Sequence, residues 1–206
     1  MAIGSKRIYL ASRSPRRREL LGQIGVGFEL LLLREDPARS ADVDETPMPG
    51  ENPHDYALRI SHAKAESGWQ RVLQRRLPHL PVLAADTVVA LGDRIMGKPA
   101  NREDAVEMLT ALSGQKHEVL TAVAMSSGGR IEQKLSVSTV QFGPLTDQAI
   151  RRYAITGEPF DKAGAYGIQG HAAVFIEKIE GSYSGVMGLP LYETAALLAS
   201  FGIEVL

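Results

Sequence analysis

The sequence contains no cysteine among its 206 residues and no excess of charge of either sign. Without thiols the chain has no disulfide framework, no cysteine nucleophile and no thiolate metal site, so its chemistry must use oxygen and nitrogen groups. The 23 Lys and Arg residues are balanced by 24 Asp and Glu, for a formal net charge of −1. A balanced chain lacks the basic field on which non-specific nucleic-acid binding relies. We therefore expect no nucleic-acid partner and predict that local clusters of cations bind a small anion.

The chain also lacks a long apolar run and several familiar motifs. No segment approaches the roughly 20 apolar residues of a membrane span, and the first ten residues contain no signal-peptide core, so we expect a cytoplasmic protein without a membrane partner. The absence of GxxxxGK[ST], of GxGxxG after a strand and of HExxH argues against a P-loop, a dinucleotide fold and a zincin site. Repeats are absent too, so residues 1–206 are predicted to form one domain.

The pattern of apolar residues predicts an α/β fold. The second strand, 28–33, is expected to be buried because apolar residues dominate it. Two segments lack a clean period: 34–53 is predicted to be a long functional loop, and the glycine density of 157–190 indicates either tight turns or backbone close to a ligand. The predicted strands span 7–11, 28–33, 82–91, 94–96, 117–125 and 134–142, and the predicted helices span 15–24, 53–72, 101–112, 146–157 and 190–202.

The first predicted helix begins with three cations. Ser14 is a suitable N-cap and Pro15 suits the first helical position, which places Arg16, Arg17 and Arg18 in the first turn. Because a helix N-terminus carries a partial positive charge, each of these cations costs roughly 0.3 to 1 kcal/mol. A bound anion would remove the penalty, and a solvated basic turn is the alternative. We expect at most two of the three arginines to face a site, with Arg18 in solvent.

Three further charged residues interrupt apolar patterns. Asp86 lies in a predicted strand of Val, Leu and Ala, so its carboxylate must be paired, metal-bound or protonated. It could act as a general base or metal ligand, or it could form a structural bend with Thr87 by accepting local N–H bonds; the sequence leaves both open. Lys64 borders the apolar stripe of helix 53–72, where its ammonium reaches either a polar pocket or solvent. Lys98 follows the hairpin after Asp86 and could return a cation to that carboxylate.

This inventory suits phosphate chemistry. Cations and helix N–H groups can hold a polyphosphate, while carboxylates of the acidic loop residues Asp42, Asp44 and Glu45 can bind a divalent metal. Gln169 lies among small residues of the glycine-rich segment, and its two donors and one acceptor could read a planar polar edge such as a nucleobase.

Six segments, in order and spanning nearly the whole chain, resemble the Maf family of nucleotide pyrophosphatases. The resemblance implies a metal-dependent hydrolase that splits nucleoside triphosphates between the α- and β-phosphates, in a family linked to cell-division arrest. It also implies an α/β fold of the Maf and inosine-triphosphatase group, with a long mixed sheet, flanking helices, a cleft between two lobes and a homodimeric assembly. The segments are LASRSPRRRELL, DETPMPGENPHDYALRISHAKA, AADTVVALGDRIMGKP, LSGQKHEVLTAV, GEPFDKAGAYGIQG and GSYSGVMGLPLYET.

Within the family, SPRR, ADT and AYGIQG resemble the branch that acts on dTTP and UTP. Three alternatives stay open: modified pyrimidine nucleotides as substrates; an N7-methyl-GTP pyrophosphatase, whose branch has Trp at the position of Arg16; and a non-catalytic nucleotide-binding regulator of cell division. Gly143 and Gly185 depart from the Arg and Asn common in the family and leave contacts there in question. Residue-by-residue matching implies Asp86 as proton acceptor; Arg16, Thr87 and Gln169 in base specificity; Ser12, Arg17, Lys64 and Lys98 on the phosphates; and Glu45 with Asp86 on Mg²⁺ or Mn²⁺.

Overall fold

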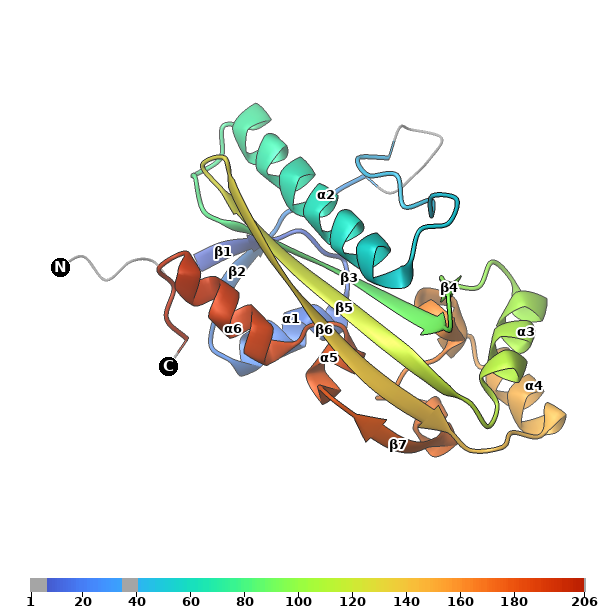
Figure 1. Cartoon of the computed structure of the whole chain (residues 1–206). Helices are drawn as coiled ribbons and strands as arrows, with labels where there is room; N and C mark the ends of the chain where they lie inside the picture. The colour runs from blue at the N-terminus through green and yellow to red at the C-terminus, as the bar shows by residue number, and fades with distance from the viewer. Residues whose placement is uncertain (1–6, 35–40, 206) are drawn as a thin grey trace.

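The fold is built on a seven-stranded mixed sheet (Figure 1), as the resemblance led us to expect. The computed structural model describes residues 7–34 and 41–205. Strands follow the order β2-β1-β3-β5-β6-β7, and β4 pairs with β3 off this path. The strands β2, β1 and β3 are parallel, whereas the remaining pairs are antiparallel. The strands are β1 (Arg7–Leu10), β2 (Gly27–Leu30), β3 (Val82–Leu91), β4 (Arg94–Met96), β5 (Lys116–Ser127), β6 (Arg130–Phe142) and β7 (Ile176–Glu180).

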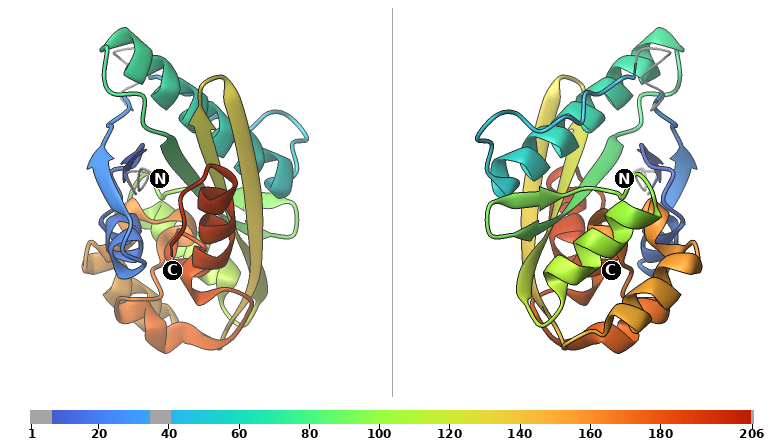
Figure 2. Two further views of the ribbon diagram at one scale, coloured as in Figure 1. Left: turned by 90° about the vertical axis from the view of Figure 1, so that its left-hand side faces the viewer. Right: turned by 90° about the vertical axis from the view of Figure 1, so that its right-hand side faces the viewer.

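Helices cover both faces of the sheet (Figures 1 and 2). The long helix α2 packs on one face through Trp69 and Val72, which join a core cluster with Val82 and Ala84 of β3. The opposite face, which carries Leu83, packs against α1 and α6. Helices α3 and α4 contact each other at the far end of the sheet. The helices are α1 (Pro15–Gln23), α2 (Pro53–Gln74), α3 (Arg102–Leu112), α4 (Asp147–Ile155), α5 (Tyr183–Met187) and α6 (Leu191–Ser200), with 3-10 turns η2 (Glu158–Asp161), η3 (Ala163–Ala165) and η4 (His171–Phe175).

One edge of β3 has a gap between two partners. β1 pairs with it at Val82 and Leu83, and β4 pairs with it only from Val89 to Leu91. Within the described residues, positions 84–88 therefore have a strand neighbour on the β5 side alone. The gap separates the part of the fold built on β1 and α1 from the part built on β4, α3 and the 3-10 turns, and it leaves the middle of a central strand without a neighbouring strand on that edge.

The second predicted strand is present but is not buried. β2 is an edge strand that pairs with β1, and Leu30 and Leu32 are 45% and 39% exposed. Leu31 and Leu33 are buried, so alternate leucines alone reach the core. The apolar run suggested a strand covered on both faces, and this prediction was wrong because β2 lies at the edge of the sheet.

Most other predicted elements are confirmed within two or three residues of their ends. Two elements, β7 and α5, lie in the glycine-rich segment and were not predicted. Among the residues that the structure describes, no helix is long and apolar enough to span a membrane.

Candidate active site

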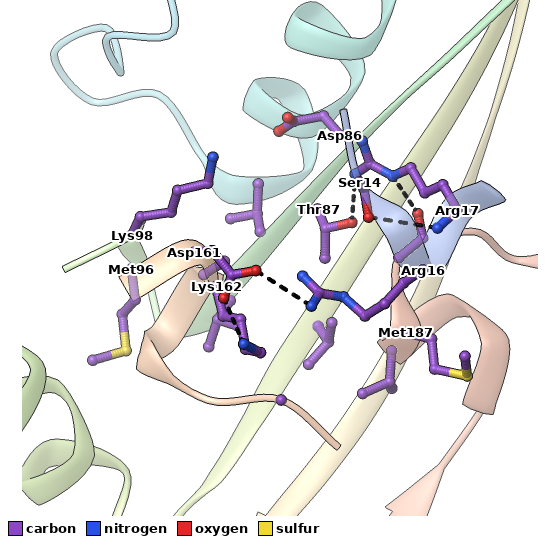
Figure 3. A pocket seen from close by; sticks show the side chains of 18 of the residues that line it. Ser14, Arg16, Arg17, Asp86, Thr87, Met96, Lys98, Asp161, Lys162 and Met187 are labelled. Carbon is purple, nitrogen blue, oxygen red and sulfur yellow. Dashed lines mark hydrogen bonds and ion pairs between the residues drawn. The ribbon is translucent and has the colours of Figure 1, made fainter. Parts of the chain in front are cut away.

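A cavity of about 770 Å³ opens at the gap in the edge of β3 (Figure 3). The start of α1, the inner side of α2, the end of β4, the turns η2 and η3, and the end of α5 complete its walls. Cations outnumber acids among the charged lining residues although the whole chain has a net charge of −1. The cavity is therefore suited to an anion. Its charged lining residues are Arg13, Arg16, Arg17, Lys64, Lys98, Lys162, Glu45, Asp86 and Asp161.

Part of the cavity wall is apolar. Val89 of β3, Met96 of β4 and Val119 of β5 line it together with Tyr166, and all four belong to one core cluster. The Tyr166 hydroxyl lies 2.8 Å from Nε2 of the buried His117, which fixes the position of the phenol. The cavity thus offers a charged region and an apolar region to one ligand, as a molecule with a polyanionic tail and a flat ring would require.

Asp86 is paired with Lys64 inside the cavity. Successive side chains of β3 alternate between the two faces, so Asp86 points to the face covered by α2, from which Lys64 extends. The Lys64 ammonium donates to Oδ1 of Asp86 at 2.8 Å and lies 2.9 Å from Oε1 of Glu45. The Asp86 and Lys64 side chains are 11% and 16% exposed. The structure thus gives Asp86 a lysine partner from another element in place of the local bend that was the alternative.

Lys64 carries its charge in this site. Burial disfavours the ammonium, but the carboxylates of Asp86 and Glu45 outweigh that effect and raise the pKa of Lys64 above its ordinary value. The same negative charges, after burial, raise the pKa of the neighbouring Tyr56 phenol. At neutral pH a positive group therefore lies between two carboxylates at the charged end of the cavity.

The loop before α2 holds Glu45 in place through its backbone. The Tyr56 hydroxyl donates to the Glu45 carbonyl at 2.8 Å, and Arg59 donates to the Thr46 carbonyl at 3.1 Å. Arg59 is itself held by both carboxylate oxygens of Glu51, at 2.6 and 2.7 Å. The Arg59 guanidinium keeps the pKa of Glu51 at about 2, so this clamp stays ionised across the neutral range.

The other two acids of the loop form structural hydrogen bonds within the loop and with α2. Asp42 accepts hydrogen bonds from Arg34 and Arg71, and Asp44 accepts one from the Thr46 N–H. Neither lines the cavity. Of the three acids singled out in the sequence, Glu45 is the one that the fold brings to Asp86.

Arg17 connects three parts of the chain on the face of β3 that is opposite to α2: the segment after β1, β3 itself and the residue that follows α5. Its guanidinium donates to the hydroxyl of Ser12 at 3.2 Å, to that of Thr87 at 3.1 Å and to the Gly188 carbonyl at 2.8 Å. Thr87 follows Asp86 and so points to the other side of the sheet, where its hydroxyl is also 3.1 Å from that of Thr121. The structure therefore brings Thr87, which the resemblance assigns to base specificity, into contact with Arg17, which it assigns together with Ser12 to the phosphates.

Arg16 crosses the cavity from α1 to the 3-10 segment (Figure 3). Its Nη1 lies 3.5 Å from Oδ2 of Asp161, whose other carboxylate oxygen contacts the ammonium of Lys162. Arg18 does not line the cavity, although it is half-buried rather than fully in solvent. The basic first turn of α1 is thus divided: Arg16 and Arg17 face the cavity, and Arg18 does not.

Two predicted site residues are less closely tied to this arrangement. Lys98 lines the cavity just after β4, but no ion pair connects it to Asp86 within the described part of the chain. Gln169 is exposed, and it is absent from the lining although its neighbours Gly167 and Ile168 belong to it. The role of Gln169 in base recognition stays a prediction.

The family model described as Maf-like protein matches residues 7–201. The chain belongs to the Maf family. Relatives named dTTP/UTP pyrophosphatase match this Maf protein over nearly their full length: one from Aromatoleum aromaticum is 60% identical over 95% of this chain and 96% of its own. A second, from Nitrosomonas europaea, is 58% identical over 96% of each chain, and a third, from Chromobacterium violaceum, is 51% identical over the whole of both.

A solved structure shows a weaker likeness to this Maf protein. The Ham1 protein of Staphylococcus aureus is 18% identical, with a TM-score of 0.42 over 68% of this chain and 72% of its own. A likeness this slight supports no inference about the activity.

The sequence did not single out Arg13, Asp161, Lys162 or Tyr166, although all four line the cavity of this Maf protein. Three of them lie in the glycine-rich segment, whose density of glycine was the available signal. No periodicity distinguished the charged residues there from ordinary turn residues, because the segment forms 3-10 turns too short for a pattern to develop.

Proposed function

We propose that this chain is a nucleoside triphosphate pyrophosphatase that hydrolyses dTTP and UTP, releasing the nucleoside monophosphate and inorganic diphosphate. The names of relatives up to 60% identical support the substrates. The observation that carries the chemistry is the buried Asp86–Lys64 pair in a cavity lined mostly by cations, with an apolar region beside it. In this arrangement the polyphosphate occupies the charged region and the base packs on the apolar wall.

Asp86 accepts a proton from the attacking water. The water oxygen attacks the α-phosphorus, the bond from that phosphorus to the bridging oxygen of the β-phosphate breaks, and the water proton passes to the Asp86 carboxylate. Lys64 holds Asp86 in place at 2.8 Å and keeps the two carboxylates together despite their mutual repulsion. The geometry therefore contributes the position of the proton acceptor Asp86, which is set by a lysine that extends from helix α2.

The cations offset the charge on the leaving diphosphate. Arg17 is oriented by Ser12, Thr87 and Gly188, so its position is fixed before a nucleotide binds. Lys98 lies on the opposite wall. Negative charge that develops on the bridging oxygen thus meets positive groups in a partly enclosed site, where they stabilise it more than in water, and Arg17 among them is already held in place.

The donor set fits a divalent cation that binds together with the substrate. Glu45 and Asp86 offer hard carboxylate oxygens within hydrogen-bond distance of one ammonium, and these two are fewer than the three metal-binding side chains of a dedicated protein cage, which no part of the described chain provides. Mg²⁺ commonly takes one or two carboxylates and completes its shell with phosphate oxygens and water. Such a cation, Mg²⁺ or Mn²⁺, would neutralise phosphate charge, with Glu45 and Asp86 as its protein ligands.

The substitution Asp86→Asn tests the assignment. It keeps the size of the side chain but removes the proton acceptor, so we expect diphosphate release from dTTP and UTP with Mg²⁺ to fall roughly 10²- to 10⁴-fold. Asp147→Asn, an exposed acid on α4 that pairs with Arg151, is the matched control and should release diphosphate at the wild-type rate. Wild-type turnover by the Asp86→Asn variant would show that another group accepts the proton.

A panel of nucleoside triphosphates tests the substrate. Preference for N7-methyl-GTP, or tight binding of nucleotide without hydrolysis in the presence of Mg²⁺ and Mn²⁺, would each contradict the proposal. A homodimer in the cytoplasm is the assembly and location that we propose with it. Light scattering on the purified protein measures the first, and cell fractionation the second.

A further inference from the structure

The ion pair between Arg16 and Asp161 spans the cavity beside its apolar region. We propose that Asp161 and Arg16 together recognise the imide edge of the pyrimidine. The Asp161 carboxylate accepts a hydrogen bond from the ring N3–H, while Arg16 donates to the carbonyl oxygen at position 4. The pair thereby selects uracil and thymine over cytosine. This inference rests on the proposed function, because it specifies how that same cavity recognises its base.

Asp161 has acceptor capacity left for a ligand. An ionised carboxylate offers about four lone-pair positions, and the structure shows one oxygen in contact with Lys162 and the other 3.5 Å from Arg16. The side chain of Asp161 is 61% exposed while it lines the cavity. Burial opposes its ionisation, but the charges of Lys162 and Arg16 outweigh that effect and lower the pKa of Asp161. At neutral pH it is therefore an acceptor only.

The segment that carries Asp161 is fixed against the sheet. The Gly164 N–H donates to the Gly97 carbonyl at 3.0 Å, and Gly164 adopts a φ of +66° so close to Val89 that a Cβ would lie 2.8 Å from its side chain. The Lys162 ammonium donates to the Glu158 carbonyl at 2.6 Å. Asp161 is thus a preorganised acceptor, and no loop has to be ordered when a base binds.

The chemistry of the bases explains the selection. Uracil and thymine present a ring N–H between two carbonyl acceptors, which complements a carboxylate beside a guanidinium. Cytosine presents an unprotonated N3 and an amino group at position 4. Its N3 would face the Asp161 carboxylate with no proton between them, and its amino group would face Arg16, donor against donor. A site built for a hydrogen bond rejects an analogue that cannot form it much more strongly than an apolar pocket does.

A binding experiment tests the proposal without relying on turnover. Calorimetry in metal-free buffer compares uridine α,β-imidotriphosphate with its N3-methyl form, which has no N3–H, and with the cytidine analogue. We expect the wild type to prefer the uridine analogue over the N3-methyl form by roughly ten- to a hundredfold. Asp161→Ala should reduce this preference to about twofold or less, chiefly because the variant binds the uridine analogue more weakly.

A second variant and a control complete the design. Asp161→Asn should raise the affinity of the cytidine analogue relative to the uridine analogue, because the amide can donate to an unprotonated N3. Asp147→Ala should leave every ratio unchanged. Unfolding in urea will verify that the variants fold.

Three results would overturn the inference. The wild type could fail to bind the uridine analogue, or it could bind the uridine analogue and its N3-methyl form with equal affinity. The third is an Asp161→Ala variant in which the affinities for both analogues fall by the same factor. If the preferences are as expected but the wild type releases no diphosphate from UTP with Mg²⁺, base recognition stands and the proposed hydrolysis fails.

Discussion

Replacing Lys64 with methionine removes the positive charge between Asp86 and Glu45 while keeping an unbranched side chain of similar length. At an effective dielectric of 20, unit charges separated by the 2.8 Å between Nζ and Oδ1 of Asp86 attract by about 6 kcal/mol. Glu45, with a side chain that is 45% exposed, adds much less because water screens it. Desolvation of the ammonium offsets several kcal/mol of this attraction.

The net loss is set by the carboxylate that stays behind. Asp86, 11% exposed, would keep a buried charge without its partner, and removing one member of such a pair costs about 3 to 5 kcal/mol. We therefore expect Lys64→Met to lower the free energy of unfolding by about 3 kcal/mol at pH 7.5. The double variant Lys64→Met, Asp86→Asn should recover at least about 1 kcal/mol of this loss, because it removes the unpaired charge.

Urea unfolding followed by the fluorescence of Trp69, the single tryptophan, measures these differences. Lys134→Met on the exposed face of β6 is the control and should stay within about 0.5 kcal/mol of the wild type. The pKa of Lys64 is raised in the folded state, so its stabilisation is fully present below the ordinary value of 10.5 and disappears as the pH rises through the raised value. A Lys64→Met variant as stable as the wild type at pH 7.5 would refute the reasoning.

Two other predictions concern packing and pH. Gly68→Ala in α2 should destabilise the fold by about 1 to 3 kcal/mol, since the added Cβ would lie 2.7 Å from Cγ1 of Val82, whereas Gly22→Ala in α1 meets open space and should stabilise by about 0.5 to 1 kcal/mol; thermal unfolding compares them, and equal shifts would contradict the packing argument. Burial lowers the pKa of His117 to about 4, so the unfolded chain binds a proton that the folded one refuses, and stability should fall between pH 6.5 and 4 by up to about 1.4 kcal/mol per pH unit. His117→Gln should flatten that slope in urea titrations, and an unchanged slope would assign it to other groups.

Much of the fold follows from the sequence because local signals and tertiary packing agree. The hairpin of β3 and β4 was predicted at its observed residues: Gly92, with a φ of +58°, supplies the turn between two apolar strands. The failures have physical reasons. A run of leucines indicates a strand, but not whether that strand lies inside the sheet or at its edge, and β7 is a short strand in a segment where glycine removes the pattern.

The candidate site was predictable where a charge interrupts an apolar pattern. Asp86 and Lys64 were each recognisable in this way, but their pairing depends on α2 covering one particular face of β3. Asp161 gave no such signal, since it lies in a glycine-rich segment without a regular period and its partner Arg16 is 145 positions away. Contacts of this kind arise from topology alone.

The gap in the edge of β3 also bears on the order in which the chain folds. The hairpin of β5 and β6 joins sequence neighbours across the Gly128–Gly129 turn, whereas Tyr9 and Val82 pair only after α1, β2 and α2 have been enclosed between them. Local pairings form sooner because less chain entropy is lost when they close. Ser12, which follows β1, and Asp86, which lies within the gap, both line the cavity, so the cavity is completed at this late closure. We therefore expect nucleotide binding to return during refolding only after most of the sheet has formed. A bound nucleotide would then indicate that β1 has paired with β3 and that the fold is complete.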